Sequence, residues 1–282
     1  MRLDAALVAR GLARSRGHAR DLIEQGVVRI GDAVAVKAAR RVESEEVIAI
    51  ADGSDALDRS WVSRAAGKLL HALEDLPGGG PALRGTRAAD VGACTGGFSQ
   101  VLLRRGACEV VAIDVGHGQL APLLRDDPRV RDLSGHNVRD LVPQDIGGEV
   151  DVLVADVSFI SLTLLMARLA RLVRRGGDLV ILIKPQFEVG RRGLDGRGVV
   201  RAASWRRAAV RTVLAGAIEE GLAVHGLVPS RVAGQDGNAE FFLRLRRPDA
   251  TAADDPAGGT GPATPAGESA AGWVRGAHID WS

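Results

Sequence analysis

The sequence predicts an α/β protein, in which a doubly wound sheet with helices on both faces follows a small α+β module. Three observations predict this fold. From residue 61 onward, strand-like apolar runs alternate with helical segments, as in a doubly wound sheet. A glycine-rich turn follows the first of these strands, and the first 51 residues combine two short helical patterns with a hairpin. The chain has 282 residues, 46% of them hydrophobic, which suits about two packed domains.

Residues 1–51 are expected to form the small module. Apolar positions at Leu3 and Leu7 have the spacing of a helix, which Asp4 could help to cap. Ser15 could begin a second helix, and Gly26 could end it in a left-handed conformation. Three short strand-like runs follow, the first two joined by a two-residue turn, at residues 27–30, 33–36 and 47–50.

The larger domain is predicted over residues 61–248, after a polar, turn-rich linker at 52–60. Its seven strand-like segments lie at residues 87–90, 109–114, 130–133, 151–155, 178–183, 223–228 and 240–246. Residues 249–282 are rich in Ala, Gly, Pro and Thr without periodicity, so we expect a disordered tail there.

Charge and composition narrow the classes of function. Residues 1–41 hold nine basic and four acidic side chains, which suits a phosphate-rich partner, although a solvated surface explains the charge about as well. No apolar run approaches the roughly 20 residues of a membrane span, and no signal peptide is visible, so we expect a cytoplasmic protein without membrane contact. The two cysteines, Cys94 and Cys108, predict neither a disulfide framework nor a metal site.

The glycine-rich turn after the first strand of the larger domain predicts a nucleotide-type cofactor. Glycines at 92, 96 and 97 would let the backbone approach a ligand closely, and Asp114 ends the next strand, where it could bind the hydroxyls of a ribose. The spacing that accommodates a pyrophosphate, Gly-x-Gly-x-x-Gly, is absent, which disfavours a dinucleotide.

The turn and its flanking residues resemble the first motif of class I methyltransferases, which use S-adenosylmethionine. In that family an acid at the position of Asp90 lies near the methionine amino group, and Asn137 matches a position that commonly contacts the adenine. A turn-forming asparagine is an equally good interpretation of Asn137. The cofactor site that this resemblance implies comprises Asp90, Gly92, Gly96, Gly97, Phe98, Asp114, Asn137 and Asp156.

Lysine is rare in this chain, and two of the three lysines flank the predicted cofactor sheet. Of 37 basic Lys and Arg residues, only Lys37, Lys68 and Lys184 are lysines, and a lysine can lose its proton whereas an arginine cannot. Lys68 and Lys184, with Asp156 and Glu240, end predicted elements at the carboxyl edge of the sheet, where open α/β folds bind ligands. Two ordinary ion pairs are the alternative interpretation, although four such residues at one edge favour a catalytic site.

These four residues match the Lys-Asp-Lys-Glu tetrad of ribose 2′-O-methyltransferases. A free lysine is protonated near neutrality and is a poor base, but burial and a second ammonium group disfavour its charged form. The match implies that Lys184 is the general base, that Lys68 and Asp156 orient it and the target hydroxyl, and that Glu240 stabilises Lys68 or the cluster as a whole.

The first module resembles the S4 RNA-binding domain through its Arg2-Leu-Asp-Ala-Ala-Leu start, its Leu-Ile-x-x-Gly helix end and its Val-x-Ile-Gly-Asp hairpin. The S4 resemblance implies that Arg14, Arg16 and Arg20 contact structured RNA. Such contacts position an RNA without reading its sequence.

Together, the motifs resemble the TlyA family, which joins an S4 domain to an FtsJ-like methyltransferase domain. The segments that match lie at residues 61–64, 90–98, 151–162, 184–190 and 237–243. The resemblance implies transfer of a methyl group from S-adenosylmethionine to cytidine 2′-hydroxyls in ribosomal RNA, with ribosomal subunits as partners. Two alternatives stay open: a non-catalytic ribosome-assembly factor that keeps the fold, and a membrane-lytic protein, since the family also carries the label hemolysin.

Overall fold

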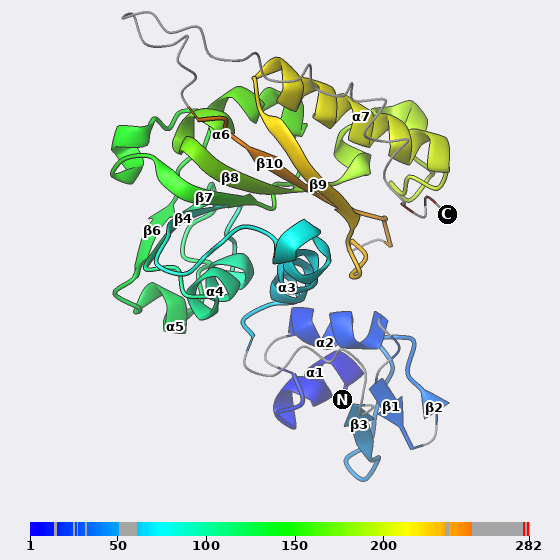
Figure 1. The fold of residues 1–282 in the computed structure, drawn as a ribbon. Helices are drawn as coiled ribbons and strands as arrows, with labels where there is room; N and C mark the ends of the chain where they lie inside the picture. Colours follow the sequence, from blue (N-terminus) through cyan, green and yellow to red (C-terminus); the bar gives the residue numbers. More distant parts are fainter. Residues whose placement is uncertain are drawn as a thin grey trace, which may run out of the picture. The chain divides into compact units, whose positions relative to one another are not determined.

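The computed structural model describes residues 1–13, 16–24, 26, 28–31, 33–50, 61–234, 237–249, 279 and 281, which form two compact units, Met1–Ser63 and Arg64–Ser282 (Figure 1). Each unit is described separately below. The expected linker at 52–60 lies outside the described residues. So does most of the expected tail, of which Asp249, Ile279 and Trp281 are described.

Unit 1 is a helix pair packed on a small antiparallel sheet, as the sequence predicts. Its helices are α1 (Leu3–Ala9) and α2 (Arg16–Glu24), and its strands are β1 (Val28–Ile30), β2 (Ala33–Val34) and β3 (Ile48–Ile50), in the order β2-β1-β3. Gly26 follows α2 with φ of +70°, the left-handed conformation expected at the end of a helix. Leu3, Leu7 and Ile23 lie in a common buried core with Val28, so the apolar faces of both helices cover the sheet.

Unit 2 contains a seven-stranded sheet in which all seven predicted strands are present. The strands are β4 (Arg87–Val91), β5 (Glu109–Asp114), β6 (Val130–Ser134), β7 (Val150–Ala155), β8 (Val173–Ile183), β9 (Ala223–Pro229) and β10 (Phe241–Arg246). Their order is β6-β5-β4-β7-β8-β10-β9; the first five are parallel, and β10 runs antiparallel to both of its neighbours. Strand β8 begins earlier than predicted because Gly176 and Gly177 exchange backbone hydrogen bonds with Arg247 instead of forming a free turn.

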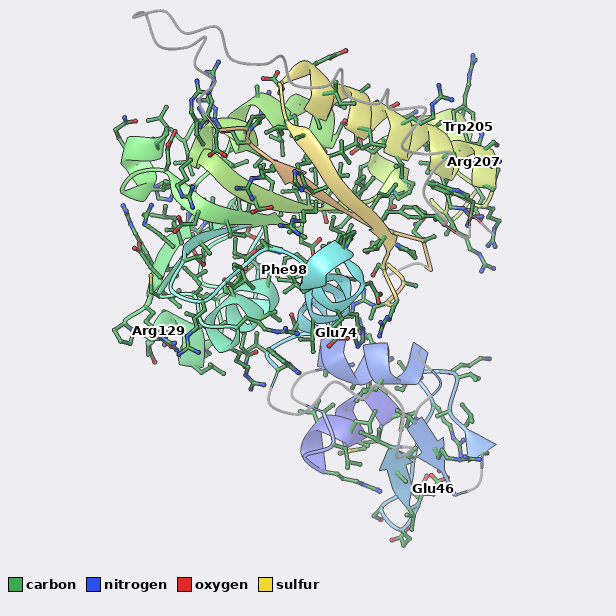
Figure 2. The ribbon with its side chains drawn as sticks, in the orientation of Figure 1. Glu46, Glu74, Phe98, Arg129, Trp205 and Arg207 are labelled. Carbon is green, nitrogen blue, oxygen red and sulfur yellow. The ribbon has the colours of Figure 1, made fainter. Side chains whose placement is uncertain are left out.

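Helices cover both faces of this sheet, which confirms the doubly wound architecture. The α-helices of unit 2 are α3 (Ala65–Asp75), α4 (Gly97–Arg104), α5 (Pro122–Arg125), α6 (Met166–Leu172) and α7 (Ala203–Glu219), and its 3₁₀ turns are η1 (Pro77–Gly79), η2 (Pro143–Ile146), η3 (Leu162–Leu164), η4 (Pro185–Phe187) and η5 (Arg191–Gly193). Residues of α6 and α7 share one buried core with β7 and β8, and Figure 1 shows α3 and α4 on the opposite face of the sheet. Trp205 and Arg207 lie exposed near the start of α7 (Figure 2).

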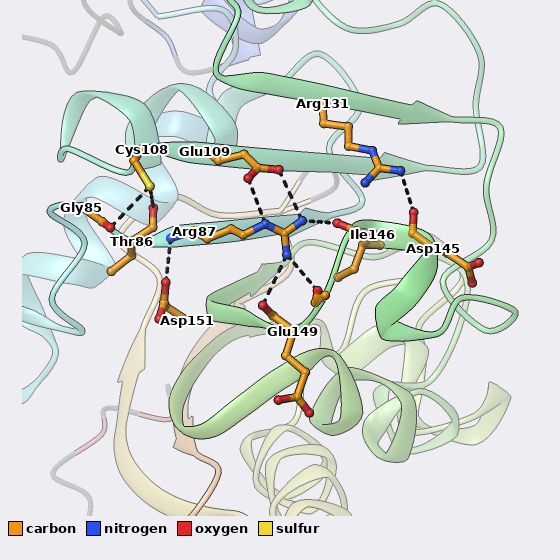
Figure 3. A network of polar contacts seen from close by, with 11 residues as sticks. Gly85, Thr86, Arg87, Cys108, Glu109, Arg131, Asp145, Ile146, Glu149 and Asp151 are labelled. Atoms are coloured by element: carbon orange, nitrogen blue, oxygen red, sulfur yellow. Dashed lines mark hydrogen bonds and ion pairs between the residues drawn. The ribbon is translucent and has the colours of Figure 1, made fainter.

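The amino-terminal edge of the sheet is held by Arg87 on β4 (Figure 3). Its guanidinium pairs with Glu109 on β5, with Nε 2.9 Å from Oε2, and donates to the carbonyl groups of Ile146, Gly148 and Glu149. One side chain therefore joins β4 and β5 to the segment that leads into β7. Planar guanidinium groups suit such multiple contacts better than a lysine amine does.

The end of the chain also contacts unit 2. Ile279 and Trp281 pack against the core, and the ring of Trp281 lies 5.0 Å from that of Phe241, the first residue of β10.

Candidate active site

Strand register brings the predicted site residues to one edge of the sheet. Val91 at the end of β4 pairs with Ala155 at the end of β7, and Ile183 at the end of β8 pairs with Phe241 at the start of β10. Asp156 and Lys184 are the residues that follow β7 and β8, and Glu240 immediately precedes β10. The carboxyl edge of a parallel sheet is where open α/β folds bind ligands.

The four predicted tetrad residues form two buried lysine–carboxylate pairs. Lys68 on α3 places Nζ 2.6 Å from Oε2 of Glu240, and Lys184 places Nζ 2.7 Å from Oδ1 of Asp156. Lys68 and Glu240 are almost fully buried, whereas the Lys184 and Asp156 side chains keep 11% and 15% of their surface exposed. The second pair is therefore the one that a substrate can reach.

Lys184 has a further partner that the sequence did not predict, because its Nζ donates a hydrogen bond to Oγ of Ser158 at 2.7 Å. The contact with Asp156 is an ion pair without the alignment of a hydrogen bond. Ser158 is exposed and lies two residues beyond Asp156. The only sequence signal was its place in the Asp-Val-Ser-Phe segment after a strand.

The glycine-rich turn needs glycine for space as well as for conformation. Gly92 has φ of +84°, and a Cβ atom there would lie 2.4 Å from the backbone oxygen of Asp156. Gly96 has φ of +90° at the N-cap of α4, where a Cβ atom would meet Leu124 at 2.2 Å, and Gly97 begins the helix. The turn therefore lies directly against the segment that carries Asp156.

Asp90 is a buried carboxylate with one unused oxygen. Its Oδ2 accepts hydrogen bonds from the backbone N and the Oγ of Ser99, at 2.8 and 2.7 Å, whereas Oδ1 has no hydrogen-bond partner among the described residues. Burial raises the pKa of Asp90 to about 7, with Asp156 and Asp114 adding to the rise and the bonds from Ser99 opposing it. Ser99 was not anticipated, because a serine in the first turn of a helix has many ordinary uses.

Three carboxylates thus act on the glycine-rich turn. Burial raises the pKa of the Cys94 thiol, and the negative charges of Asp114, Asp156 and Asp90 raise it further. Asp114 also holds the turn, since its Oδ2 accepts from the backbone N of Cys94 at 2.8 Å and its Oδ1 from that of Gly116 at 2.7 Å. The electrostatic field here favours a positively charged ligand and keeps the thiol protonated.

Two other predicted cofactor residues have local roles in the structure. The Phe98 side chain is buried, and its ring lies 6.0 Å from that of Phe242, so it packs in the core (Figure 2). The Oδ1 atom of exposed Asn137 accepts from the backbone N of Arg139 at 3.1 Å, the turn-forming contact that the sequence left open for it.

An exposed aromatic residue directly follows Ser158, the hydrogen-bond partner of Lys184. Phe159 is 91% exposed and has φ of +65°, and its ring lies 5.2 Å from that of Phe187 after β8. Glu188, the next residue, accepts hydrogen bonds from Ser161 Oγ at 2.5 Å and from the backbone N of Leu162 at 2.9 Å. Burial raises the pKa of Glu188, and these two bonds oppose the rise.

In unit 1, two of the three predicted RNA-binding arginines, Arg16 and Arg20, lie against a buried acid. Asp4 accepts from Arg2 and from Arg16, at 3.1 and 3.0 Å, and Arg20 Nε lies 3.6 Å from the same carboxylate. The bonds from Arg2 and Arg16 hold the pKa of Asp4 well below its usual range. Asp4 also accepts from the backbone N of Ala5, but its main contacts are the arginines rather than the cap that the sequence suggested. Arg14 lies outside the described residues.

Across the part of the chain that the structure describes, no group of three or more His, Cys, Asp or Glu side chains could hold a metal ion. Among those same residues, no helix is long and apolar enough to cross a membrane.

The chain matches known families over both units. Residues 1–48 match the S4 domain family, and residues 61–247 match the FtsJ-like methyltransferase family. A relative from Mycobacterium tuberculosis, named 16S/23S rRNA (cytidine-2'-O)-methyltransferase TlyA, is 48% identical over 245 residues, which are 87% of this chain and 89% of the relative. The chain belongs to the TlyA family. This confirms the resemblance that the motifs indicated.

Other members of the TlyA family carry a different name. Hemolysin A of Brachyspira hyodysenteriae is 32% identical over 87% of this chain and 99% of the relative. A solved structure of a protein from Streptococcus thermophilus, also named as a hemolysin, has a TM-score of 0.70 and 35% identity, covering 89% of each chain. An S-adenosylmethionine-dependent methyltransferase from Listeria monocytogenes, with a TM-score of 0.50 and 14% identity over 66% of this chain and 100% of its own, shares the fold of unit 2.

Proposed function

We propose that this protein transfers a methyl group from S-adenosylmethionine to the ribose 2′-hydroxyl of a cytidine in 16S or 23S ribosomal RNA. Residues 61–248 would form the catalytic domain and residues 1–51 the RNA-docking domain, joined by 52–60. The observation that best supports this function is the pair of lysine–carboxylate contacts at the carboxyl edge of the sheet, beside the glycine-rich turn. Two relatives in the family are named rRNA (cytidine-2'-O)-methyltransferases, which agrees with this function.

Lys184 has the geometry of a general base. Its amine donates a hydrogen bond to Ser158 and lies against the carboxylate of Asp156, and in the neutral form its lone pair could take the proton of a hydroxyl group. Lys68, in its buried pair with Glu240, would fix the neighbouring part of the same edge of the sheet. Orientation of the hydroxyl by these fixed groups would supply much of the rate.

The residues of the turn fit a sulfonium cofactor. S-adenosylmethionine, when bound, supplies an activated methyl group and carries positive charges on its sulfonium and ammonium groups. The unused Oδ1 of Asp90 and the carboxylate of Asp156 are suited to those charges, Asp114 would accept from the ribose hydroxyls, and the Gly92 backbone leaves room for close approach. Gly96, Gly97, Phe98 and Asn137 would complete the site, with Phe98 contributing through its backbone because its ring is buried in the core.

RNA would meet the protein at two kinds of surface. Arg16 and Arg20, oriented by buried Asp4, present half-exposed guanidinium groups suited to phosphates, and Arg14 is proposed to join them. The exposed ring of Phe159, one residue after the Ser158 that binds Lys184, offers a flat face on which the base of the target nucleotide could stack. The S4 domain would then deliver the RNA, and the catalytic edge would select the ribose.

The test is methyl transfer from radiolabelled S-adenosylmethionine to separated small and large ribosomal subunits, with the product mapped by nuclease digestion and mass spectrometry. We expect label on the 2′-oxygen of a cytidine ribose. Cofactor binding without any labelled RNA would contradict the proposal and favour a non-catalytic assembly role.

Two lysine-to-arginine variants distinguish the proton-accepting role of a lysine from the effect of its positive charge. Lys184→Arg keeps the positive charge but removes the option of neutrality, so we expect transfer to be lost while cofactor affinity stays near that of the wild type. Lys37→Arg is the matched control, because Lys37 is an exposed lysine in unit 1 and its replacement should leave transfer unchanged. Wild-type turnover by Lys184→Arg would exclude Lys184 as the base.

A further inference from the structure

The two segments that leave β7 and β8 are joined at three successive places. Lys184 contacts Asp156 and Ser158, the ring of Phe187 contacts that of Phe159, and Glu188 binds Ser161 and Leu162. The contacts run in the same direction along both segments. The segments 156–162 and 184–188 are therefore one assembled unit, and we call it the paired-loop unit.

Phe159 is the strained member of the paired-loop unit. A φ of +65° is uncommon for a residue other than glycine, asparagine or aspartate, and a bulky side chain in this conformation strains the backbone. Burial of the ring does not offset this strain, since the side chain is 91% exposed. Such strain persists where neighbouring contacts hold the backbone, and it is typical of functional sites.

Glu188 supplies the contacts that hold the segment just beyond Phe159. Its two carboxylate oxygens accept one hydrogen bond each, from the hydroxyl of Ser161 and the backbone N of Leu162. The Glu188 backbone is itself fixed, because its N donates to the carbonyl of Pro185 at 3.0 Å, one residue after Lys184. A bidentate carboxylate anchored next to one catalytic residue thus fixes the segment that carries the other.

We infer that Glu188 is a positioning residue for methyl transfer, which acts through its bonds to Ser161 and Leu162 by holding Ser158 against Lys184 and Phe159 against Phe187. The inference rests on the proposed function. Nothing in this role requires Glu188 to touch the RNA or the cofactor. Loss of its carboxylate should release the Phe159 backbone to a relaxed conformation and move the hydroxyl of Ser158 away from the Lys184 amine.

The test compares Glu188→Ala with Glu188→Gln. A glutamine can still accept from Leu162 N through its oxygen and donate to Ser161 Oγ through its amide, whereas alanine can do neither. We expect single-turnover transfer at saturating RNA and cofactor to fall about tenfold to a hundredfold in Glu188→Ala and to recover most of that loss in Glu188→Gln. The dissociation constant for S-adenosylmethionine should change less than about twofold in both variants.

Asp145→Ala is the matched control. Asp145 also caps a 3₁₀ turn, with Oδ2 accepting from Val142 N at 2.8 Å, but that turn precedes β7 at the opposite edge of the sheet. Its loss should leave the single-turnover rate unchanged. A double-mutant cycle between Glu188→Ala and Ser161→Ala adds a second measurement, since two residues acting through one hydrogen bond give non-additive losses.

The outcomes distinguish this inference from the proposed function. A wild-type protein that transfers no methyl group contradicts the proposed function itself. An active wild type with an equally active Glu188→Ala overturns the positioning role. Equal losses in the alanine and glutamine variants, together with loss of cofactor binding or melting of the fold, would also overturn it, because they would show a general structural role.

Discussion

Replacement of Asp90 by asparagine should change the free energy of unfolding by an amount that depends on pH. In the native protein burial raises the pKa of Asp90 from 3.8 to about 7, so between these values the native state binds a proton that the unfolded state has lost. Wild-type stability therefore falls as pH rises through this range. One pKa unit corresponds to 1.36 kcal/mol, so the raised pKa of Asp90 lowers the free energy of unfolding by roughly 4 kcal/mol at pH 8. At pH 5 the same effect is only about 1.6 kcal/mol.

Asparagine does not titrate, so Asp90→Asn should gain about 3 kcal/mol relative to the wild type on going from pH 5 to pH 8. This difference does not depend on the fixed cost of placing an amide against Ser99, which is the same at every pH. The measurement is urea unfolding of the full chain followed by circular dichroism at pH 5, 6, 7 and 8. Asp126→Asn serves as the control for loss of a carboxylate, because the Asp126 side chain is 68% exposed.

Cofactor affinity should change with pH in the opposite direction from the free energy of unfolding. If the unused oxygen of Asp90 meets a positive group of S-adenosylmethionine, Asp90→Asn should weaken binding at pH 8, and wild-type affinity should decline as Asp90 takes up a proton below pH 7. Calorimetry in two buffers would detect proton release on binding near pH 6. A stability difference between Asp90→Asn and the wild type that stays constant from pH 5 to 8 would refute the raised pKa and the reasoning built on it.

Three other variants test separate parts of the structure. In thermal unfolding, Gly92→Ala should destabilise unit 2 by at least about 2 kcal/mol, and it should also impair cofactor binding. Gly79→Ala is the control, because Gly79 has φ of +75° but nothing lies within 4 Å of the new Cβ. It should lose only about 1 kcal/mol, the cost of a left-handed backbone conformation for alanine. In filter binding, Asp4→Asn should weaken RNA binding about fivefold, roughly 1 kcal/mol, although loss of the carboxylate makes the net charge of unit 1 more positive. Tighter binding by the variant would mean that net charge alone determines RNA affinity. Arg87→Ala should lower the free energy of unfolding by about 2 to 3 kcal/mol, because three carbonyl groups lose their hydrogen-bond donor. The single-turnover rate should stay unchanged, because Arg87 lies at the other edge of the sheet. A variant that is stable but slow would contradict this separation of the two edges.

The sequence predicted the fold and the edge at which the site lies because both depend on local patterns. Strand-like runs and glycine turns can be recognised from residues that are adjacent in the sequence. Once the strands are placed, Asp156, Lys184 and Glu240 must lie at one edge of the sheet. The pairing of Lys68 with Glu240 was implied by the family resemblance, since these residues stand 172 positions apart in the chain.

The contacts that orient the site could not be predicted, because they depend on loop conformations. The hydroxyl of Ser158 reaches Lys184 and the carboxylate of Glu188 reaches Ser161 only after two loops adopt specific backbone angles, including the positive φ of Phe159. No periodic pattern marks such residues. The same holds for Asp4, whose helical position suggested a cap but whose burial among three arginines depends on the packing of α1 against α2.

The placement of two of the three lysines, Lys68 and Lys184, agrees with a role that arginine cannot fill. The other ion pairs of the described residues use arginine, for example Arg87 with Glu109 and Arg244 with Asp178, where a planar group that keeps its charge is an advantage. Lysine occurs in the two pairs at the carboxyl edge of the sheet, where the proposed reaction needs a side chain of a type that, unlike arginine, can lose its proton. Lys37, exposed in unit 1, has neither constraint, so its exchange for arginine should have no effect, whereas the same exchange at Lys184 should abolish transfer.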